Sequence, residues 1–343
     1  MKRCLFLLLL LCVLCACTPT SQTGKVVLPE ETQAPAYDPV DTTAQADPNT
    51  APLSPRFGGL YAYGGVRYIV DTEGNLVAWG LGEDAHSLSA LTGGDVAFDD
   101  RIVLLENIKE VKGHYSWTMA LNADGNLYSW NNSPISLLME GVKAFDVGFD
   151  FGAAILEDNS LWLWGDDMYG QQGLGMPETE DSYPPHKCLD NVQTVRCNGF
   201  GVFAVTCGGD LYYWGNFRGT PQKIATNVRD CRDGLLLTTD GELFTYGFPQ
   251  PEAYPPAPED EVVFLTEPTG LTAERLVSGG FVNENYSLFL WQDNNAHHVA
   301  DNVVDAGPGG EAGTYLYLTA DDLLHKFDRT TWSDTWRYRL DEI

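Results

Sequence analysis

The sequence predicts an all-β protein: a seven-bladed β-propeller of antiparallel sheets, preceded by a signal helix and a disordered tether. One unit recurs seven times within residues 57–343, and it consists of an apolar strand, a turn rich in Asp, Asn and Gly, and a second strand that ends in an aromatic residue. A small sheet built from such a unit cannot bury both of its faces alone. Stacking seven of them around an axis buries these faces and leaves only short edges.

Seven aromatic residues mark equivalent positions in the repeats. They are Trp79, Trp130, Trp164, Trp214, Tyr246, Trp291 and Phe327. Successive markers are 51, 34, 50, 32, 45 and 36 residues apart, and the average of about 41 is typical of propeller blades. Because every repeat places its marker at the same position, we expect these rings to pack in the gaps between blades rather than to bind a ligand.

The segment before each marker predicts a β-hairpin. Asp124-Gly125 and Asp240-Gly241 supply turn residues that tolerate positive φ, and Leu127–Trp130 alternates with the period of a strand. A further short strand that ends near a glycine precedes most copies, as in Val142–Gly148. Each unit is therefore expected to be a sheet of about four strands.

The end of the chain has the composition of a strand, from Arg329 to Leu340. An open ring would leave unprotected strand edges, which proteins usually cover. We therefore expect one terminal segment to pair with the sheet at the opposite end of the repeat array and to close the ring.

The N-terminus predicts export. Lys2 and Arg3 precede an apolar run from Cys4 to Leu14, which is typical of a secretory signal peptide and too short to span a bilayer. The run ends Leu14-Cys15-Ala16-Cys17, which resembles the bacterial lipobox. This resemblance implies cleavage after residue 16 and acylation of Cys17, for example with palmitate. The alternative is an ordinary signal peptide followed by a chance cysteine.

Residues 17–56 predict a lipid-anchored linker. This segment is rich in Pro, Thr and Asp, and cannot bury enough apolar surface to offset the entropy lost on folding. Together with an acylated Cys17 it would hold the folded part on the outer face of a bacterial cell membrane. Residues 1–16 would then be the signal peptide and residues 57–343 the propeller.

The charge excludes one class of partner and one mode of membrane binding. Asp and Glu number 48 and Lys and Arg number 20, so the net charge is −28. Nucleic-acid phosphates and anionic lipid headgroups would be repelled by this charge. We therefore expect no nucleic acid as a partner, and contact with the membrane through the Cys17 lipid only.

The repeat resembles the regulator-of-chromosome-condensation repeat. The clearest copy runs from Trp164 through the glycine-rich stretch Gly170-Gln-Gln-Gly173-Leu-Gly175 to Trp214 and Gly215. The resemblance covers about residues 57–330 and implies a seven-bladed propeller whose faces engage other proteins. It also implies scaffold, adhesin-like or inhibitory roles outside the cell, and not the family's nuclear role, because this chain is acidic and predicted to be exported. The glycine-rich stretch is well kept only at 165–175.

No catalytic motif is present. The sequence contains no nucleophile elbow, no His-Glu-x-x-His and no nucleotide-binding glycine loop. Acidic pairs such as Asp166-Asp167 fall in predicted turns, where Asp is favoured for hydrogen bonding to the backbone. We therefore expect no catalytic residue, metal or cofactor.

Four cysteines remain beyond Cys17 in the predicted propeller. They are Cys188, Cys197, Cys207 and Cys231. Their spacing is not typical of metal ligands, while an even number in an exported protein allows two disulfides. Cys197 and Cys231 occupy similar places in adjacent repeats and are candidates for a bridge. Four reduced thiols are the alternative.

A final set of residues, mostly aromatic, departs from the repeat pattern near the loops after the inner strands. It comprises Tyr115, Trp117, Phe149, Asp150, Phe151 and Phe200. In a ring these loops emerge on one face around the axis, where an aromatic and acidic surface suits a protein or a glycan; local packing of the loops is the alternative. We expect a cell-surface lipoprotein that binds another protein. The other hypotheses are a propeller that binds carbohydrate or cell wall, and an extracellular hydrolase or lyase acting in the propeller cleft.

Overall fold

The computed structural model describes residues 60–63, 66–71, 73–80, 101–114, 117–131, 134–175, 182–248, 264–308, 313–321 and 323–339. Every described residue belongs to the unit Ala46–Ile343. The predicted signal peptide, Cys17 and the linker of residues 17–56 lie outside the described residues. The described segments contain no helix with the length and apolar character needed to cross a membrane.

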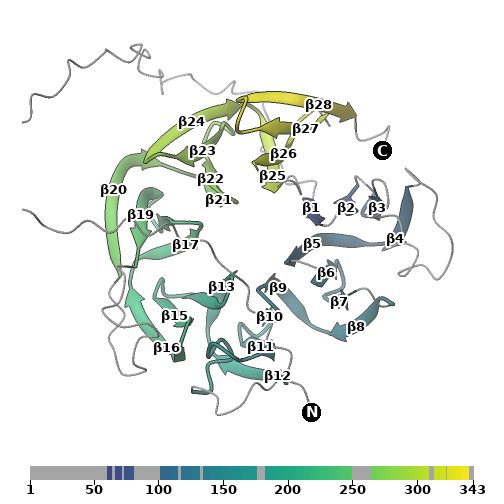
Figure 1. Cartoon of the computed structure of the whole chain (residues 1–343). Helices are drawn as coiled ribbons and strands as arrows, with labels where there is room; N and C mark the ends of the chain where they lie inside the picture. The colour runs from purple at the N-terminus through teal and green to yellow at the C-terminus, as the bar shows by residue number, and fades with distance from the viewer. Residues whose placement is uncertain are drawn as a thin grey trace, which may run out of the picture. The chain divides into compact units, whose positions relative to one another are not determined.

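Seven antiparallel sheets of four strands form a ring (Figure 1). Each sheet consists of four consecutive strands, with the first strand nearest the axis and the fourth at the rim. The prediction of a seven-bladed all-β propeller is confirmed, as is the number of strands in each unit.

The first four blades contain sixteen strands. Blade 1 is β1 (Leu60–Tyr63), β2 (Val66–Val70), β3 (Leu76–Gly80) and β4 (Ile102–Leu105), and blade 2 is β5 (Ile108–His114), β6 (Trp117–Asn122), β7 (Leu127–Trp130) and β8 (Ser136–Met139). Blade 3 is β9 (Val142–Val147), β10 (Phe151–Leu156), β11 (Leu161–Asp166) and β12 (Ser182–Leu189), and blade 4 is β13 (Val192–Asn198), β14 (Gly201–Thr206), β15 (Leu211–Gly215) and β16 (Arg218–Ala225).

The remaining three blades follow the same order. Blade 5 is β17 (Val228–Arg232), β18 (Leu235–Thr238), β19 (Glu242–Gly247) and β20 (Leu265–Thr272). Blade 6 is β21 (Arg275–Val277), β22 (Gly280–Val282), β23 (Leu288–Gln292) and β24 (Asn295–Ala300), and blade 7 is β25 (Val303–Pro308), β26 (Thr314–Thr319), β27 (Leu323–Asp328) and β28 (Ser333–Arg339).

The marker aromatics lie on the third strand of each blade and pack against the preceding blade. Trp214 of blade 4 is fully buried beside Phe151 and Leu163 of blade 3. Trp130, Trp164 and Phe327 are likewise buried between blades, while Tyr246 and Trp291 are half-buried against the same kind of cluster. Six of the seven markers therefore pack between blades; the side chain of Trp79 lies outside the described part of blade 1.

The ring closes by side-chain packing, so the predicted strand exchange is wrong. Among the described strands, β28 pairs only with β27, and blade 1 is built from β1 to β4 alone. Ile69 and Val77 of blade 1 share an apolar cluster with Val304 and Leu316 of blade 7. The described C-terminal segment is already needed as the fourth strand of its own blade, so it is not available to pair with the opposite end.

Hairpin turns tie each blade to the next. At the end of β6 the Asn122 side-chain oxygen accepts hydrogen bonds from the backbone N–H groups of residues 124 and 126, at 3.1 and 2.8 Å. In the same turn Gly125 has a φ of 83°, and its carbonyl accepts the N–H of Val142, the first residue of blade 3, at 2.8 Å. The Gly74 carbonyl accepts the N–H of Ile108 in the same way at 2.7 Å. The predicted Asp/Asn-Gly turns therefore also position the neighbouring blade.

Trp214→Ala should destabilise the fold strongly. The substitution removes a fully buried ring between blades 3 and 4 and leaves the Gln171 carbonyl without the Trp214 Nε1 donor, now at 2.9 Å. We expect the free energy of unfolding in urea to fall by about 3–5 kcal/mol. The control is Trp332→Ala, at a ring that is 36% exposed, with an expected loss of about 1 kcal/mol or less. Equal losses for the two variants would contradict the packing role.

Candidate functional site

Each face of the ring is formed by a different set of turns between strands. Successive strands of a blade run antiparallel, so the turns after the first and third strands open on one face. The turns after the second and fourth strands open on the other. We call the former the aromatic face, because an aromatic cluster lies on it. The predicted loop residues Phe149, Asp150 and Phe200 all belong to this face.

The structure brings two of the predicted aromatic residues into contact. The rings of Phe149, after β9, and Phe200, after β13, have centroids 5.1 Å apart. Asp150 is exposed beside Phe149. Trp117 starts β6 and is half-buried against the core between blades 2 and 3, and Tyr115 lies outside the described residues.

Phe151 is a core residue, so its predicted place on the surface is wrong. It begins β10 and is fully buried, packed with Leu163 and Trp214. Its ring occupies the space that Gly148 leaves, since a Cβ at residue 148 would lie only 2.0 Å from the ring. The sequence placed Phe151 in a loop, but the strand begins at this residue and directs the side chain inward.

Five rings form a continuous strip across blades 2, 3 and 4. Centroid distances along it are 5.9 Å from His114 to Phe149, 4.1 Å from Phe200 to Tyr169 and 5.0 Å from Tyr169 to Phe217. We call these five residues the aromatic strip. His114, Tyr169 and Phe217 were not predicted. The signal for Tyr169 was its place in the one well-kept glycine-rich stretch.

Hydrogen bonds fix Tyr169 in the strip. Its N–H donates to the Gln171 side-chain oxygen at 2.8 Å, and the Asp166 carboxylate accepts the Gln171 amide at 2.9 Å. The Tyr169 carbonyl accepts the Phe217 N–H at 2.9 Å, which joins the loop to blade 4. Met168 and Leu174 of this loop are 39% and 57% exposed. The strip is therefore held rigidly and has exposed apolar side chains beside it.

Phe217 adopts a backbone conformation that bulky residues avoid. Asn216 and Phe217 connect β15 to β16 with φ values of 49° and 71°, as in a type I′ turn, where Asn-Gly is preferred. A left-handed conformation costs a non-glycine residue about 1–2 kcal/mol. Of the thirteen described non-glycine residues with positive φ, ten are Asn or Asp. Phe217 is therefore retained against a local penalty, which is typical of functional sites.

Two opposing effects act on the pKa of the His114 imidazole: its burial and its acidic neighbours. Burial lowers its pKa below the ordinary value, and the charges of Asp150 and Asp146 partly oppose this effect. At neutral pH the ring is therefore uncharged, and the aromatic strip carries no positive charge at this end.

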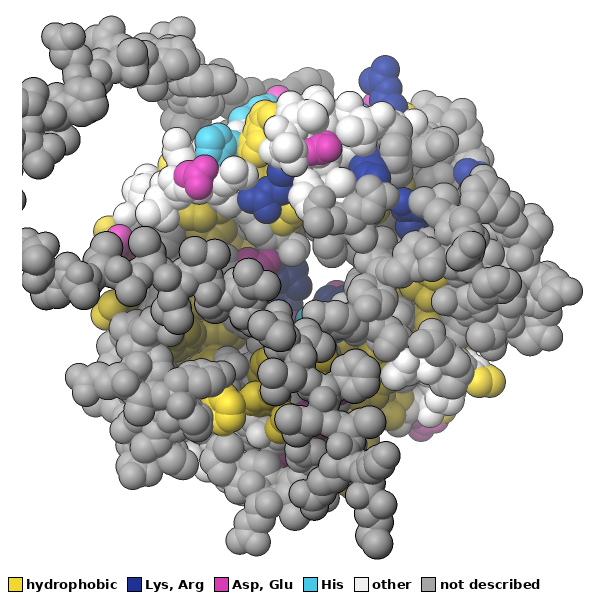
Figure 2. Space-filling model, in the orientation of Figure 1, with side chains coloured by type: hydrophobic (Ala, Val, Ile, Leu, Met, Phe, Trp, Pro, Cys, Tyr) yellow, Lys and Arg dark blue, Asp and Glu magenta, His cyan; other side chains and the backbone are white. Residues whose placement is uncertain are grey.

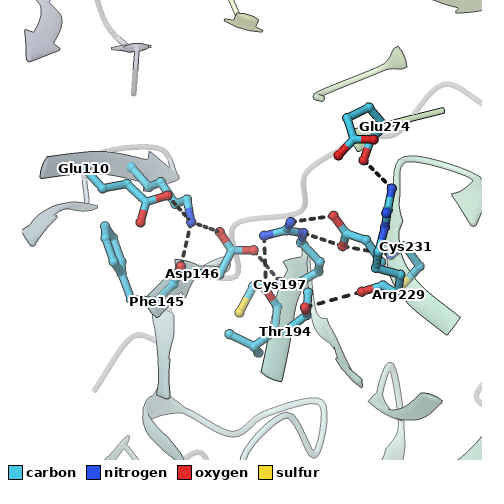
Figure 3. A network of polar contacts seen from close by, with 12 residues as sticks. Glu110, Phe145, Asp146, Thr194, Cys197, Arg229, Cys231 and Glu274 are labelled. Atoms are coloured by element: carbon cyan, nitrogen blue, oxygen red, sulfur yellow. Dashed lines mark hydrogen bonds and ion pairs between the residues drawn. The ribbon is translucent and has the colours of Figure 1, made fainter. Parts of the chain in front are cut away.

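A second feature is the charged lining of the axis, which the sequence analysis missed. Figure 2 shows an opening at the centre of the ring with basic and acidic side chains in its wall. Lys112 on β5 pairs with Glu110 at 2.8 Å and approaches Asp146 on β9 at 4.0 Å (Figure 3). Arg196 on β13 binds both carboxylate oxygens of Asp230 on β17, at 2.9 and 2.6 Å.

The network continues around the ring to blade 7. Arg229 on β17 donates to the carbonyls of Ala273 and Glu274. Arg275 on β21 donates to the Val304 carbonyl at 2.8 Å, near Asp305 on β25. Burial raises the pKa of Asp305 to about 6, and the positive charge of Arg275 opposes this rise. The axis is thus lined by alternating charges from neighbouring inner strands.

All four cysteines of the propeller carry free thiols, so the candidate Cys197–Cys231 disulfide is not formed. Cys197 packs at the core between blades 3 and 4, and Cys231 is buried between blades 4 and 5. The sheet of blade 4 therefore separates them. The pairing was suggested because the two cysteines occupy equivalent positions in adjacent repeats. Equivalent positions lie in successive layers of the ring, so the two thiols do not meet.

The acidic pair at 166–167 serves its loop. Asp167 is buried, and one of its oxygens accepts the Gln172 N–H at 2.8 Å. Together with the contacts of Asp166 this confirms the predicted turn role. The described residues contain no group of three His, Cys, Asp or Glu side chains placed to hold a metal ion.

One arrangement in blade 7 resembles a hydrolase triad in composition. The Asp334 carboxylate lies 2.9 Å from His325 Nδ1, and His325 Nε2 lies 3.5 Å from the Thr319 hydroxyl. That hydroxyl donates instead to Asp321 at 2.6 Å, and His325 is only 8% exposed. A nucleophile must present its proton to the base. This network therefore joins β26, β27 and β28 rather than forming a catalytic site.

Comparison with known proteins identifies the fold type. No protein-family model matches the chain. It is 30% identical over 253 residues to the ultraviolet-B receptor UVR8 of Arabidopsis thaliana, covering 59% of this chain and 56% of that one. It is 25% identical over 209 residues to protein RCC1 of Candida albicans, covering 46% and 44%. Prp20p from Saccharomyces cerevisiae superposes with a TM-score of 0.53 at 16% identity, over 74% of this chain and 80% of that chain.

This chain is a seven-bladed β-propeller that is similar to RCC1 and to UVR8. It spans about half the length, or less, of the curated relatives that it matches. The similarity to Prp20p concerns the fold. The regulator-of-chromosome-condensation resemblance read from the repeats is thus supported by relatives and by architecture.

Asp305→Asn should flatten the pH dependence of stability. The pKa of Asp305 in the folded RCC1-like propeller is about 6, above its ordinary value near 4, so the folded state binds this proton more tightly than the unfolded state. Stability should fall as pH rises from about 4 through about 6. We expect the variant to lose much less stability over this pH range. At pH 8 its free energy of unfolding should exceed that of the wild type by roughly 1–3 kcal/mol. Chemical denaturation at several pH values measures this, and identical slopes would contradict the assignment.

Proposed function

We propose that the aromatic face binds another protein, and that the protein acts as a non-catalytic binding propeller. The aromatic strip, flanked by exposed Met168 and Leu174, is the observation that carries the proposal. Aromatic residues and Met are enriched in the buried centres of protein interfaces, where a few rings supply most of the affinity. A rigid strip also loses little conformational entropy on binding.

The relatives support a binding role. RCC1-like propellers are usually non-catalytic binding domains. The structure of Prp20p is described with its binding to Gsp1p and histones, and UVR8 is named a receptor. For this chain we transfer only the use of a propeller face for protein binding. Scaffold, adhesin-like and inhibitory roles all fit such a surface, and an extracellular hydrolase or lyase is the weakest alternative.

Glycan or cell-wall binding is the second candidate. Trp332, in the turn between β27 and β28, is 36% exposed on the aromatic face and has a φ of 52°. His297 and Phe327 hold its ring, with centroids at 5.1 and 5.2 Å. An exposed, supported Trp suits stacking on a sugar, and a glycan array separates this function from protein binding.

We further propose that the propeller is displayed outside the cell as a lipoprotein. The lipobox-like Leu14–Cys17 and the proline-rich linker of residues 17–56 support this proposal. A tether would let the aromatic face reach partners beyond the membrane surface.

Cys17→Ala should abolish lipid attachment. The thiol is the acceptor of the acyl chains in the proposed lipoprotein, so its loss should release the protein from the membrane fraction. Metabolic labelling with an alkyne fatty acid and mass spectrometry of the N-terminus would measure this. Wild-type protein that keeps Met1 or incorporates no label would contradict the proposal.

Phe217→Gly should remove partner binding without loss of stability. Glycine accepts the positive φ of this turn, so relief of backbone strain offsets the lost ring contact with Tyr169. We expect a free energy of unfolding within about 1 kcal/mol of the wild type. Quantitative mass spectrometry after affinity capture from culture medium should show proteins that the wild type retains and the variant does not.

The matched control is Tyr286→Gly. Tyr286 also has positive φ, at 60°, but lies in the turn between β22 and β23 on the opposite face. This variant should retain the same proteins as the wild type. Equal capture by all three proteins would rule out the aromatic strip as the binding surface.

A further inference from the structure

Arg218, beside the aromatic strip, is a basic residue that forms no ion pair with the residues the structure describes. The net charge of the chain is −28, and other described basic side chains such as Lys112, Arg196 and Lys223 form ion pairs. The Nε of Arg218 is buried without a hydrogen-bond partner, and the Arg218 side chain forms no hydrogen bond or ion pair with the described residues. A buried donor that lacks an acceptor costs stability. The structure therefore keeps a buried guanidinium Nε without an acceptor among the described residues.

The position of Arg218 connects it to the strip. It is the first residue of β16 and follows Phe217 directly, opposite Gly215 in the register of β15 and β16. The glycine-rich loop lies alongside, because the Gly175 N–H donates to the Gly219 carbonyl at 2.8 Å. A partner lying on Phe217 and Tyr169 would therefore be within reach of Arg218.

A second hydrogen-bond donor is close to Arg218. The Tyr213 hydroxyl accepts a hydrogen bond from the Asn216 side-chain amide at 2.6 Å, and its own proton has no acceptor among the described residues. Burial raises the pKa of Tyr213, and Asn216 and the nearby charge of Arg218 partly oppose this, so the hydroxyl stays protonated at neutral pH. Gly201 adds no side chain here, since a Cβ would lie 3.1 Å from the Tyr213 oxygen.

We propose that Arg218 and the Tyr213 hydroxyl bind a side-chain carboxylate, Asp or Glu, of the protein partner, next to apolar residues that lie on the aromatic strip. This inference rests on the proposed function, because it gives the chemistry of the partner at the same surface. The planar guanidinium matches a carboxylate with two parallel hydrogen bonds. A single negative charge fits better than a polyanion, which the net charge of −28 would repel.

Selection of random peptides tests this proposal. A phage-displayed library is panned against the immobilised full chain, with Phe217→Gly as the counter-selection. We expect the enriched peptides to combine apolar residues with an Asp or Glu. One enriched peptide is then synthesised with its acid and with the matching amide, and binding of both is measured by fluorescence anisotropy.

Arg218→Gln should weaken binding of the acidic peptide at least about tenfold, because a charged hydrogen bond is lost, and should leave the amide peptide unchanged. The control Arg337→Gln removes one arginine from the exposed outer strand β28 and should affect neither peptide. The melting temperature of Arg218→Gln should not fall, because the Arg218 side chain has no hydrogen bond or ion pair with the described residues to lose.

Two results would overturn the inference in distinguishable ways. If enriched peptides depend on Phe217 but contain no acid, or bind Arg218→Gln as well as wild type, the protein-binding strip stands and the carboxylate contact is wrong. If no peptide depends on Phe217, the proposed function itself fails, and the carboxylate contact fails with it.

Discussion

The structure depends on one constraint: every sheet in the ring has two apolar faces, and only a neighbouring sheet can cover them. A four-stranded sheet is too small to form a core by itself. The third strand therefore carries a large aromatic side chain that packs on the preceding blade, as Trp214 packs on Phe151. Seven such layers surround the axis, and the closing layer between blades 7 and 1 uses Ile69 and Leu316 in the same way.

The same constraint decides where polar groups go. The inner strands converge on the axis, which brings charged groups of neighbouring blades together. Lys112 on β5 therefore lies near Asp146 on β9, and Arg196 on β13 pairs with Asp230 on β17. Residues in the core are constrained by packing and those at the axis by ion pairs, so the turn residues can change more freely. Rings from three blades meet on one face because the turns after first and third strands emerge there together.

Most of the fold could be predicted from the sequence, because packing between blades repeats the same residue type at the same position. The markers from Trp130 to Phe327 identified the layers for this reason. The hairpin turns could also be predicted, since Asp-Gly is one of few residue pairs that accept positive φ, as at Gly125 and Gly241. The way in which the ring closes could not be predicted, because the strand-like composition of residues 329–340 is compatible with pairing at either end of the repeat array.

The candidate site was predicted only in part. Phe149 and Phe200 were found because they follow inner-strand glycines, whereas Phe151 was misplaced by the position of a strand boundary. The axial charges were missed because inner strands such as β5, β13 and β17 change register near their first residues, so simple alternation does not tell which side chains face the axis. Tyr169 and Phe217 meet across 48 positions of sequence, which no local pattern reveals.

The confinement of each blade to one uninterrupted stretch of chain has an evolutionary consequence. When a sheet combines strands from both termini, copying or deleting a repeat must preserve that shared sheet. Here every described blade is complete in itself, so duplication of one gene segment would add a whole module with its own interface to the next. Ring size and the choice of surface loops can then change independently, which leaves the exposed turns free to diversify while the stacking positions stay fixed.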